Sequence, residues 1–300
     1  MVAPWFYNEW GHEFMDQRLG ILVGTLGLAA TLLAGCGPSA TPEPADRLRV
    51  TVSILPQKYF VERIGGEHVD VTVMVQPGAS PATYEPKPEQ LRALSRADAY
   101  IGIGVPFEKA WLDRIASANP EMLIVDTTKG IERMGEPENP DPHIWLSPRL
   151  VKIQARTIYE ALAQLDPAHK DAYKANLEGF LADVDALDAD IRRTLEGVRS
   201  RKFMVLHPSW GYFARDYGLE MIPIEVGGQE PSAAELAALI ATAREEGIRA
   251  IFAQPEFSTR AAETIAREIG GEVLLISPLA PDWPDNLRHV ARTLGEVLSR

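Results

Sequence analysis

Residues 169–198 read HKDAYKANLEGFLADVDALDADIRRTLEGV and contain no proline. Apolar residues recur every three or four positions, at Leu177, Phe180, Leu181, Val184, Leu187, Ile191 and Leu195. This spacing predicts one long amphipathic helix. About 30 residues at about 1.5 Å each span about 45 Å, which is long enough to join two domains stiffly. A helix packed wholly on one domain is the alternative reading of the same pattern.

The sequence on either side of this helix alternates short apolar runs with amphipathic segments. The runs before it lie at 48–55, 69–75, 99–103 and 122–125, and those after it at 203–206, 221–226, 250–253 and 272–276. Strand and helix alternation of this kind is typical of parallel α/β sheets. We therefore predict an α/β fold with two four-stranded parallel-sheet lobes, 48–167 and 200–300, joined by a long rigid backbone helix over 168–199.

Composition excludes several classes of protein. The chain has 300 residues, 46% of them hydrophobic and 24% charged, which is ordinary for a globular protein. Its formal net charge of −12 opposes binding to phosphate backbones, so we expect no nucleic-acid partner. Cys36 is the only cysteine, which rules out an intramolecular disulfide and a thiolate metal cluster.

The N-terminus explains this cysteine. An apolar run at 19–33 follows Arg18, and LAGC at 33–36 comes directly after it. The run is shorter than the roughly 20 residues of a membrane-spanning helix, so a cleaved signal is favoured. The LAGC box resembles the bacterial lipoprotein signal, in which Cys36 becomes the lipidated first residue of the mature chain. A plain secretory signal with an unmodified thiol is the alternative.

The lipoprotein signal also predicts where the mature chain begins and where in the cell the protein is located. We predict a lipoprotein signal peptide at 1–36, with Met15 as a possible true start, and a flexible tether at 37–47. We expect the mature protein to be extracytoplasmic and anchored to the bacterial membrane by its lipid, in the periplasm or on the outer face of the cell membrane.

Two histidines stand out. Ligands of parallel α/β sheets bind at the carboxyl ends of strands. His143 and His207 both lie in proline-flanked, aromatic-rich loops at a predicted strand end or domain junction, whereas His68, His169 and His289 lie in turns or helical surface patterns. Neutral imidazole is a common zinc ligand, so a pair facing one cleft is a metal-site hypothesis. Hydrogen-bonded structural histidines are the alternative.

Six motifs, together with the lipoprotein box, carry a family resemblance. They are PGASP and YEP within 77–86, DPHIWLSP at 141–148, HPSWGYF at 207–213, FAQPEFS at 252–258 and SPLA at 277–280. Their order and spacing over about 250 residues resemble the zinc/manganese solute-binding proteins of ABC importers. The resemblance implies one divalent metal captured between two lobes and handed to a membrane permease and its ATPase.

This sequence has the family's metal ligands at some positions but not at others. His143 and His207 match two family ligands, and a histidine at the position of His207 is associated in the family with zinc rather than manganese. Ala82 stands where the family usually has a histidine, and Ser277 where it has an aspartate. We therefore expect Zn²⁺ as the transported ion, bound by a site that departs from the family pattern.

Three outcomes remain open at this stage. Nearby oxygens can complete a displaced site, for which Glu85, Asp141, Glu225, Glu256, Ser277 and Asp282 are the candidates. The two histidines can instead bind metal weakly, or bind a metal held by a small chelator. Finally, the cleft can take a non-metal solute. We expect Ala82, Tyr84, Trp145 and Trp210 to wall the cleft or to support its ligands.

Other classes of function compete with this one. Neither His-Glu-x-x-His nor Gly-x-Ser-x-Gly occurs, so the usual signals of zinc proteases and serine hydrolases are missing, and we predict a binding protein rather than an enzyme. A surface lipoprotein acting in adhesion is the alternative from another class. We expect the protein to be a monomer.

Overall fold

The computed structural model describes residues 47–225 and 228–300. Within them, two four-stranded parallel sheets form, and their strands begin and end close to the predicted runs. The first sheet contains β1 (Leu48–Val52), β2 (Val69–Val73), β3 (Ala99–Gly102) and β4 (Leu123–Asp126). The second contains β7 (Lys202–Val205), β8 (Glu220–Pro223), β9 (Ala250–Ala253) and β10 (Glu272–Leu275). The predicted α/β class with two sheets is confirmed.

The two sheets have the same topology. Their strand orders are β2-β1-β3-β4 and β10-β9-β7-β8, so in each lobe the first strand lies between the second and the third, and the fourth lies at an edge. Every neighbouring pair within these two sheets is parallel. The carboxyl ends of all strands in one sheet therefore open onto one edge, where loops converge.

The remaining helices pack around these sheets. In the N-terminal lobe they are α1 (Leu55–Gly65), α2 (Pro88–Leu94), α3 (Pro106–Ala118) and α4 (Pro148–Leu165). In the C-terminal lobe they are α6 (Gly211–Tyr217), α7 (Ala233–Glu245), α8 (Arg260–Ile269) and α9 (Trp283–Leu298). Proline at the first or second position of α1, α2, α3, α4 and α9 presets the helical backbone at each start.

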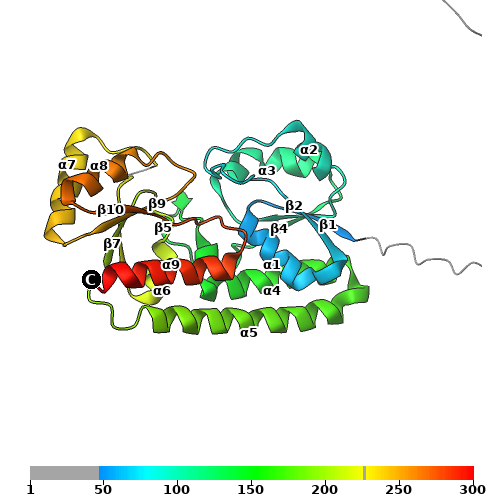
Figure 1. The fold of residues 1–300 in the computed structure, drawn as a ribbon. Coiled ribbons are helices and arrows are strands. Elements are labelled where there is room, and N and C mark those ends of the chain that lie inside the picture. The colour runs from blue at the N-terminus through cyan, green and yellow to red at the C-terminus, as the bar shows by residue number, and fades with distance from the viewer. Residues whose placement is uncertain (1–46, 226–227) are drawn as a thin grey trace, which may run out of the picture. The chain divides into compact units, whose positions relative to one another are not determined.

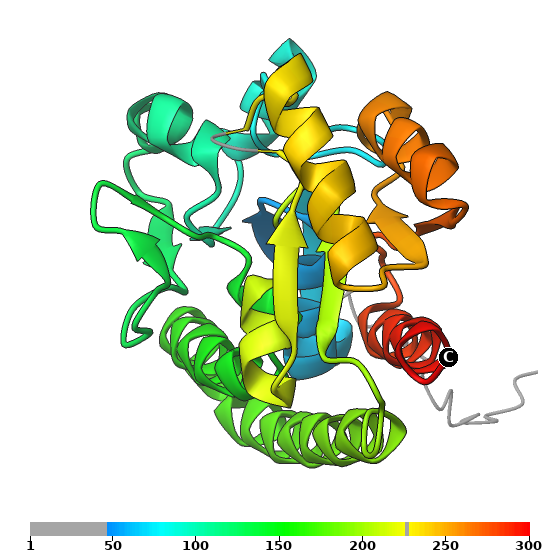
Figure 2. The same ribbon diagram turned by 90° about the vertical axis from the view of Figure 1, so that its left-hand side faces the viewer.

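The long helix predicted around residues 169–198 is α5 (Lys170–Thr194). It begins after a short 3₁₀ turn and ends before Gly197, whose positive φ of 74° suits glycine. Figure 1 shows α5 running along the base of the molecule, and Figure 2 shows it obliquely, below α4 and α9. It packs against α1 and α4 of the first lobe and α9 of the second, so it joins both lobes.

An aromatic cluster strengthens this junction. The ring centroid of Trp283, at the start of α9, lies 5.0 Å from that of Phe60 on α1 and 6.5 Å from that of Phe180 on α5. All three side chains are fully buried. Burying large aromatic rings in edge-to-face contact stabilises the arrangement of the three helices beyond the area removed from water. The described residues of both lobes belong to a single compact unit.

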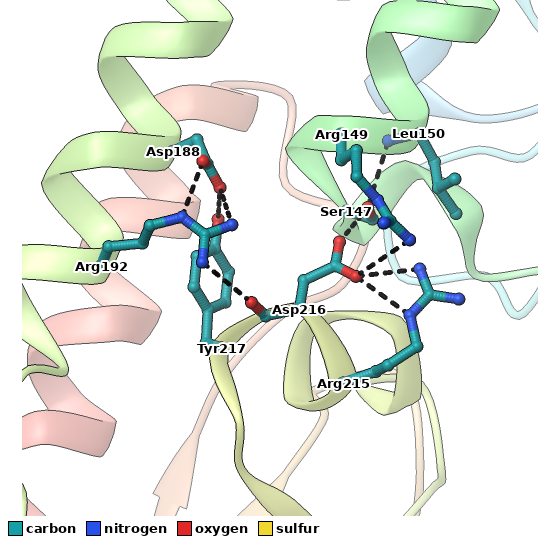
Figure 3. A network of polar contacts seen from close by, with 8 residues as sticks. All are labelled: Ser147, Arg149, Leu150, Asp188, Arg192, Arg215, Asp216 and Tyr217. Carbon is teal, nitrogen blue, oxygen red and sulfur yellow. Dashed lines mark hydrogen bonds and ion pairs between the residues drawn. The ribbon is translucent and has the colours of Figure 1, made fainter.

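A polar network adds a second junction between the lobes, shown in Figure 3. Ser147, the N-cap of α4, accepts a hydrogen bond from the Leu150 amide and donates one to Asp216 of α6. The side chain of Asp216 is only 4% exposed and also pairs with Arg149 and Arg215. Charge-assisted hydrogen bonds in so buried a position hold α6 against the start of α4.

Arg192 of α5 continues the network (Figure 3). Its guanidinium pairs with Asp188 at 2.9 Å and donates to the backbone carbonyl of Asp216 at 3.2 Å. Asp188 also accepts a hydrogen bond from the Tyr217 hydroxyl at 2.9 Å. Burial raises the pKa of Tyr217 well above its ordinary value, so this phenol remains a donor. The long helix is thus bonded to α6 as well as packed on α9.

Some features were not predicted, and others lie outside the described residues. The segment 135–140 forms a small antiparallel hairpin, β5 (Gly135–Glu136) and β6 (Asn139–Pro140), which is not among the predicted runs. The signal segment, Cys36 and residues 37–46 of the tether are not among the described residues. Within the part that is described, no helix combines the length and apolar character needed to cross a bilayer.

Candidate metal-binding cleft

A cleft of about 470 Å³ lies at the carboxyl ends of the strands, lined from both lobes. The N-terminal lobe contributes residues 80–82, 105 and 106, and the segment before α4 contributes 134, 135, 139–143 and 145. The C-terminal lobe contributes 207–209, 211, 221, 228, 256, 257, 278 and 279. His143 and His207 are therefore lining residues of one cleft.

His207 lies two residues after the end of β7; two side chains contact its imidazole, and a third bonds its backbone. Nδ1 lies 2.7 Å from Oε2 of Glu225, which follows β8. Phe257 stacks on the ring with centroids 4.7 Å apart. Gln254 accepts a hydrogen bond from the His207 amide and donates one to its carbonyl. A carboxylate on Nδ1 makes that nitrogen the proton donor, so Nε2 keeps a lone pair for a metal.

The imidazole of His143 shows the same pattern of contacts. Its Nδ1 lies 2.7 Å from Oδ1 of Asp141, and the same oxygen accepts a hydrogen bond from the His143 amide at 2.9 Å. The imidazole centroid lies 5.1 Å from that of Trp145. Asp141 thus orients His143 as Glu225 orients His207, and in both residues Nε2 is the nitrogen left for coordination.

The two imidazoles lie close together, with ring centroids 5.5 Å apart and planes at 73°. Their side chains are 14% and 19% exposed, so both are largely shielded from bulk solvent. Across residues 47–225 and 228–300, however, no three His, Cys, Asp or Glu side chains are arranged to hold a metal ion. The described residues therefore bring together a two-histidine half-site, with Asp141 and Glu225 already engaged on the Nδ1 atoms.

The structure also locates the other candidate ligands. Glu85 and Asp282 are exposed and do not line the cleft. Ser277 lines a smaller adjoining pocket, where its hydroxyl donates to Oε1 of Glu256 at 3.2 Å and accepts from the Leu279 amide. Glu256 lines both cavities, and its Oε2 is buried with no hydrogen-bond partner among the described residues.

Of the expected cleft-wall residues, Ala82 and Trp145 line the cleft, whereas Tyr84 and Trp210 do not. Tyr84 is buried against Phe107 and donates to Gln90, and burial raises its pKa. Trp210 is fully buried at the start of α6, and its ring centroid lies 5.8 Å from that of Phe213. Both are packing residues of loops that border the cleft.

The loop of His143 is bonded to the C-terminal lobe. The Trp145 indole donates to the Pro278 carbonyl at 2.7 Å, and the Trp283 indole donates to the Trp145 carbonyl at 2.7 Å. The Tyr212 hydroxyl accepts from the Met134 amide at 2.8 Å and donates to the Asp141 carbonyl at 2.9 Å. Burial raises the pKa of Tyr212, which keeps this phenol protonated as a donor.

Sequence reasoning missed several residues that matter here. Phe257 and Gln254 fall within the quoted FAQPEFS motif, and Tyr212 within HPSWGYF, but their contacts with the histidine loops were not predicted. A residue that stacks on an imidazole carries no signal in a single sequence. The one indication that Phe257, Gln254 and Tyr212 belong to the site was their location inside motifs that also hold candidate ligands.

Two similar α/β lobes, a stiff connecting helix and a cleft at the strand ends define a class of protein: a two-lobed solute-binding protein of the kind that carries its ligand between the lobes. A family model described as "Zinc-uptake complex component A periplasmic" matches residues 50–297. The chain belongs to this family. The family consists of components of an uptake complex, so the chain is a binding protein and not an enzyme.

Individual relatives agree with the family match. The chain is 30% identical to the high-affinity zinc uptake system protein ZnuA of Bacillus subtilis, with 83% of this chain and 85% of that protein covered. Among solved structures, a crystal structure of ZnuA is 50% identical with a TM-score of 0.83, covering 85% of this chain and all of the other. A zinc-bound deletion mutant of ZnuA, also 50% identical, has a TM-score of 0.82 and covers 85% and 99%.

A further solved relative has a second activity in its description. It is the laminin-binding protein Lmb of Streptococcus agalactiae, described as bifunctional, with adhesin and metal-transporting activity. It is 26% identical, covers 84% of this chain and 99% of its own, and has a TM-score of 0.77.

Proposed function

We propose that this protein captures zinc in the interlobe cleft and delivers it to the permease and ATPase of an ABC importer. The observation that carries the proposal is the pair of imidazoles, each with Nδ1 on a carboxylate and Nε2 left for coordination, facing one cleft. Zinc accepts imidazole nitrogen readily, and a carboxylate on the other ring nitrogen raises the basicity of the ligand. The zinc-uptake relatives support the choice of ion.

The half-site is preorganised. Trp145 and Tyr212 bond the His143 loop to the lobe that carries His207, so the two imidazoles are held against the same body. We infer that a tilt of the N-terminal lobe changes access to the metal without separating the two histidines. The long α5 helix and the Asp216 network restrict that tilt to a small angle.

Direct metal titration tests the proposal. Zinc and manganese are added to the purified protein, and heat of binding and melting temperature are recorded. We expect a 1:1 zinc complex and a raised melting temperature, because a ligand that binds only the folded state stabilises it. The double variant His143→Ala/His207→Ala should lose both effects. His289→Ala, which removes an exposed histidine on α9, is the matched control and should keep them. A zinc response unchanged in the double variant contradicts the proposal.

Delivery and anchoring need separate tests. We propose that Cys36 is lipidated and holds the protein at the membrane as a monomer. Incorporation of labelled palmitate, and recovery in the membrane fraction, should both be lost in Cys36→Ala. Growth of a zinc-limited host should depend on the protein together with its permease and ATPase. Soluble, unlabelled wild-type protein contradicts the lipid anchor but leaves metal capture standing.

Adhesion is a second candidate function, favoured by the description of the Streptococcus agalactiae relative. We propose to test it by measuring binding of the purified protein to immobilised laminin, with and without zinc. Saturable binding that survives the double histidine substitution supports an adhesive surface separate from the cleft. Absence of binding rejects this second candidate for laminin.

A further inference from the structure

The described residues bring only two metal donors into the cleft, the Nε2 atoms of His143 and His207. Zinc in proteins is almost always four-coordinate, so about two ligands have to come from elsewhere. The nearest carboxylates do not supply them as placed, because Asp141 and Glu225 are bonded to the Nδ1 atoms. The donor set is therefore suited to a metal that brings ligands of its own.

The size and walls of the cleft suit an organic co-ligand. Its volume of about 470 Å³ falls within the range of about 300–1,000 Å³ that is usual for small-molecule pockets. The loops after β2 and β3 line it with Pro81, Ala82, Val105 and Pro106, and Ser80 is the one polar lining residue in these two loops. Apolar walls give nothing to a hydrated ion, but they bury the carbon atoms of a small molecule.

Two buried polar atoms at the cleft have no partner among the described residues. One is Oε2 of Glu256, and the other is Oγ of Ser209. Both residues line the cleft. A buried carboxylate oxygen without a donor is costly, and an amine N–H is a strong partner for it. Because both residues line the cleft, a rotation of either side chain would offer its unpartnered oxygen to a ligand that carries N–H or O–H groups beyond its metal-binding atoms.

We propose that this chain takes zinc as a complex with a small aminocarboxylate chelator of amino-acid size. His143 and His207 supply two ligands, the chelator supplies the others, and its zinc-bound amine donates a hydrogen bond to Glu256. This inference rests on the proposed function, since it assumes that the two histidines bind zinc. Multiply anionic chelators such as citrate are disfavoured, because Asp141, Glu225 and Glu256 are all acidic groups at or behind the cleft wall.

The test is equilibrium dialysis with labelled zinc and labelled L-histidine at buffered free zinc. We expect the protein to retain zinc and histidine together in a ratio near 1:1:1. At equal free zinc, histidine should increase zinc retention about tenfold, which corresponds to about 1.4 kcal/mol. Citrate should give no such increase. Zinc retained at full occupancy without any bound histidine overturns the inference.

Two variants sharpen this test. Glu256→Gln should lower histidine retention about tenfold. Glu245→Gln, an exposed residue on α7, is its control. Ala82→His/Ser277→Asp restores the two donors that the family pattern has, so it should bind zinc alone more tightly and exclude histidine. If neither variant changes histidine retention, the inference fails.

The outcomes separate the two proposals. Zinc binding that is tight, complete and indifferent to every chelator leaves the proposed function intact and rejects this inference. No zinc retained under any condition rejects both.

Discussion

The two lobes share one sheet topology, yet their strand ends differ in chemistry. In the C-terminal lobe, the loops after all four strands carry polar groups that meet at the cleft or beside it, namely His207, Glu225, Gln254 with Glu256, and Ser277. In the N-terminal lobe, the loops after β2 and β3 line the cleft almost entirely with apolar side chains, among them Pro81, Ala82 and Pro106. One topology thus supports a ligand-bearing wall and an apolar wall, because strand-end loops are free to change while the sheet is conserved in form.

The largest expected effect comes from the carboxylates behind the histidines. Glu225→Gln should weaken zinc binding about 10- to 100-fold, because an amide supports the Nδ1–H tautomer less well than a carboxylate does. Asp141→Asn should weaken zinc binding to a similar extent, because Asp141 contacts His143 as Glu225 contacts His207. Calorimetric titration measures both, with the exposed Glu67→Gln as the control. Unchanged affinity in Glu225→Gln means that its contact with His207 is only structural.

One substitution can add a metal ligand to the apolar wall of the cleft. Ala82→His places an imidazole on the apolar wall and should tighten zinc binding about tenfold, since it adds a third protein donor. Thr83→His, at the exposed neighbouring position outside the cleft lining, is the matched control. Competition with a colorimetric zinc chelator gives the affinities. Equal affinity in both variants shows that position 82 is too far from the metal to coordinate it.

Removing a hydrogen bond between the His143 loop and the C-terminal lobe should affect zinc binding less. Tyr212→Phe removes a hydroxyl that accepts from Met134 and donates to Asp141. The loss should lower the free energy of unfolding by about 1–2 kcal/mol. Zinc affinity should fall only a few-fold. Urea denaturation and calorimetry test this, with Tyr159→Phe as a control on α4. A large loss of affinity without loss of stability contradicts a purely positional role.

The smallest effect concerns the buried carboxyl of the N-terminal lobe. Burial raises the pKa of Glu108 above its ordinary 4.5, although hydrogen bonds from Ser53, Ile103 and Gly104 oppose the shift. A raised pKa in the folded state means that the contribution of Glu108 to stability is complete below the ordinary value. It is lost as pH rises through the folded value.

Glu108→Gln removes this titration. Wild-type protein should therefore lose stability relative to Glu108→Gln as pH rises above about 4.5, over the window that ends at the raised pKa. Thermal melts across pH 4–8 measure the difference. Glu121→Gln, an exposed glutamate before β4, is the control and should follow the wild type. A constant difference between wild type and Glu108→Gln across this range contradicts the prediction.

Much of the architecture was predictable because it depends on local pattern. The predicted run at 250–253 matches β9, and the others differ from their strands by one to three residues at an end. The largest errors at one end are three residues. The run at 48–55 extends past β1 because α1 begins at Leu55 with its own buried residues, and the run at 221–226 extends past β8. The hairpin at 135–140 was missed, since two-residue strands carry no periodic signal.

The site was less predictable. His143 and His207 were identified as candidates, and the structure places them in one cleft, but their metal role stays a prediction. Glu85 and Asp282 were equal candidates in the sequence and lie exposed outside the cleft. Asp141 and Glu225 were named as possible ligands, whereas the structure shows each on the Nδ1 atom of a histidine.

The sequence alone determined the α/β class, the two lobes, the stiff helix between them and the loops that carry the imidazoles. Periodicity and proline placement act over a few neighbouring residues, so a single chain displays them. Only the tertiary structure decided which carboxylate orients which histidine, and that Glu256, which lines the cleft, has a buried oxygen without a partner among the described residues. Such pairings join residues that are distant along the chain, such as Glu225 and His207, and they depend on how the strand ends converge.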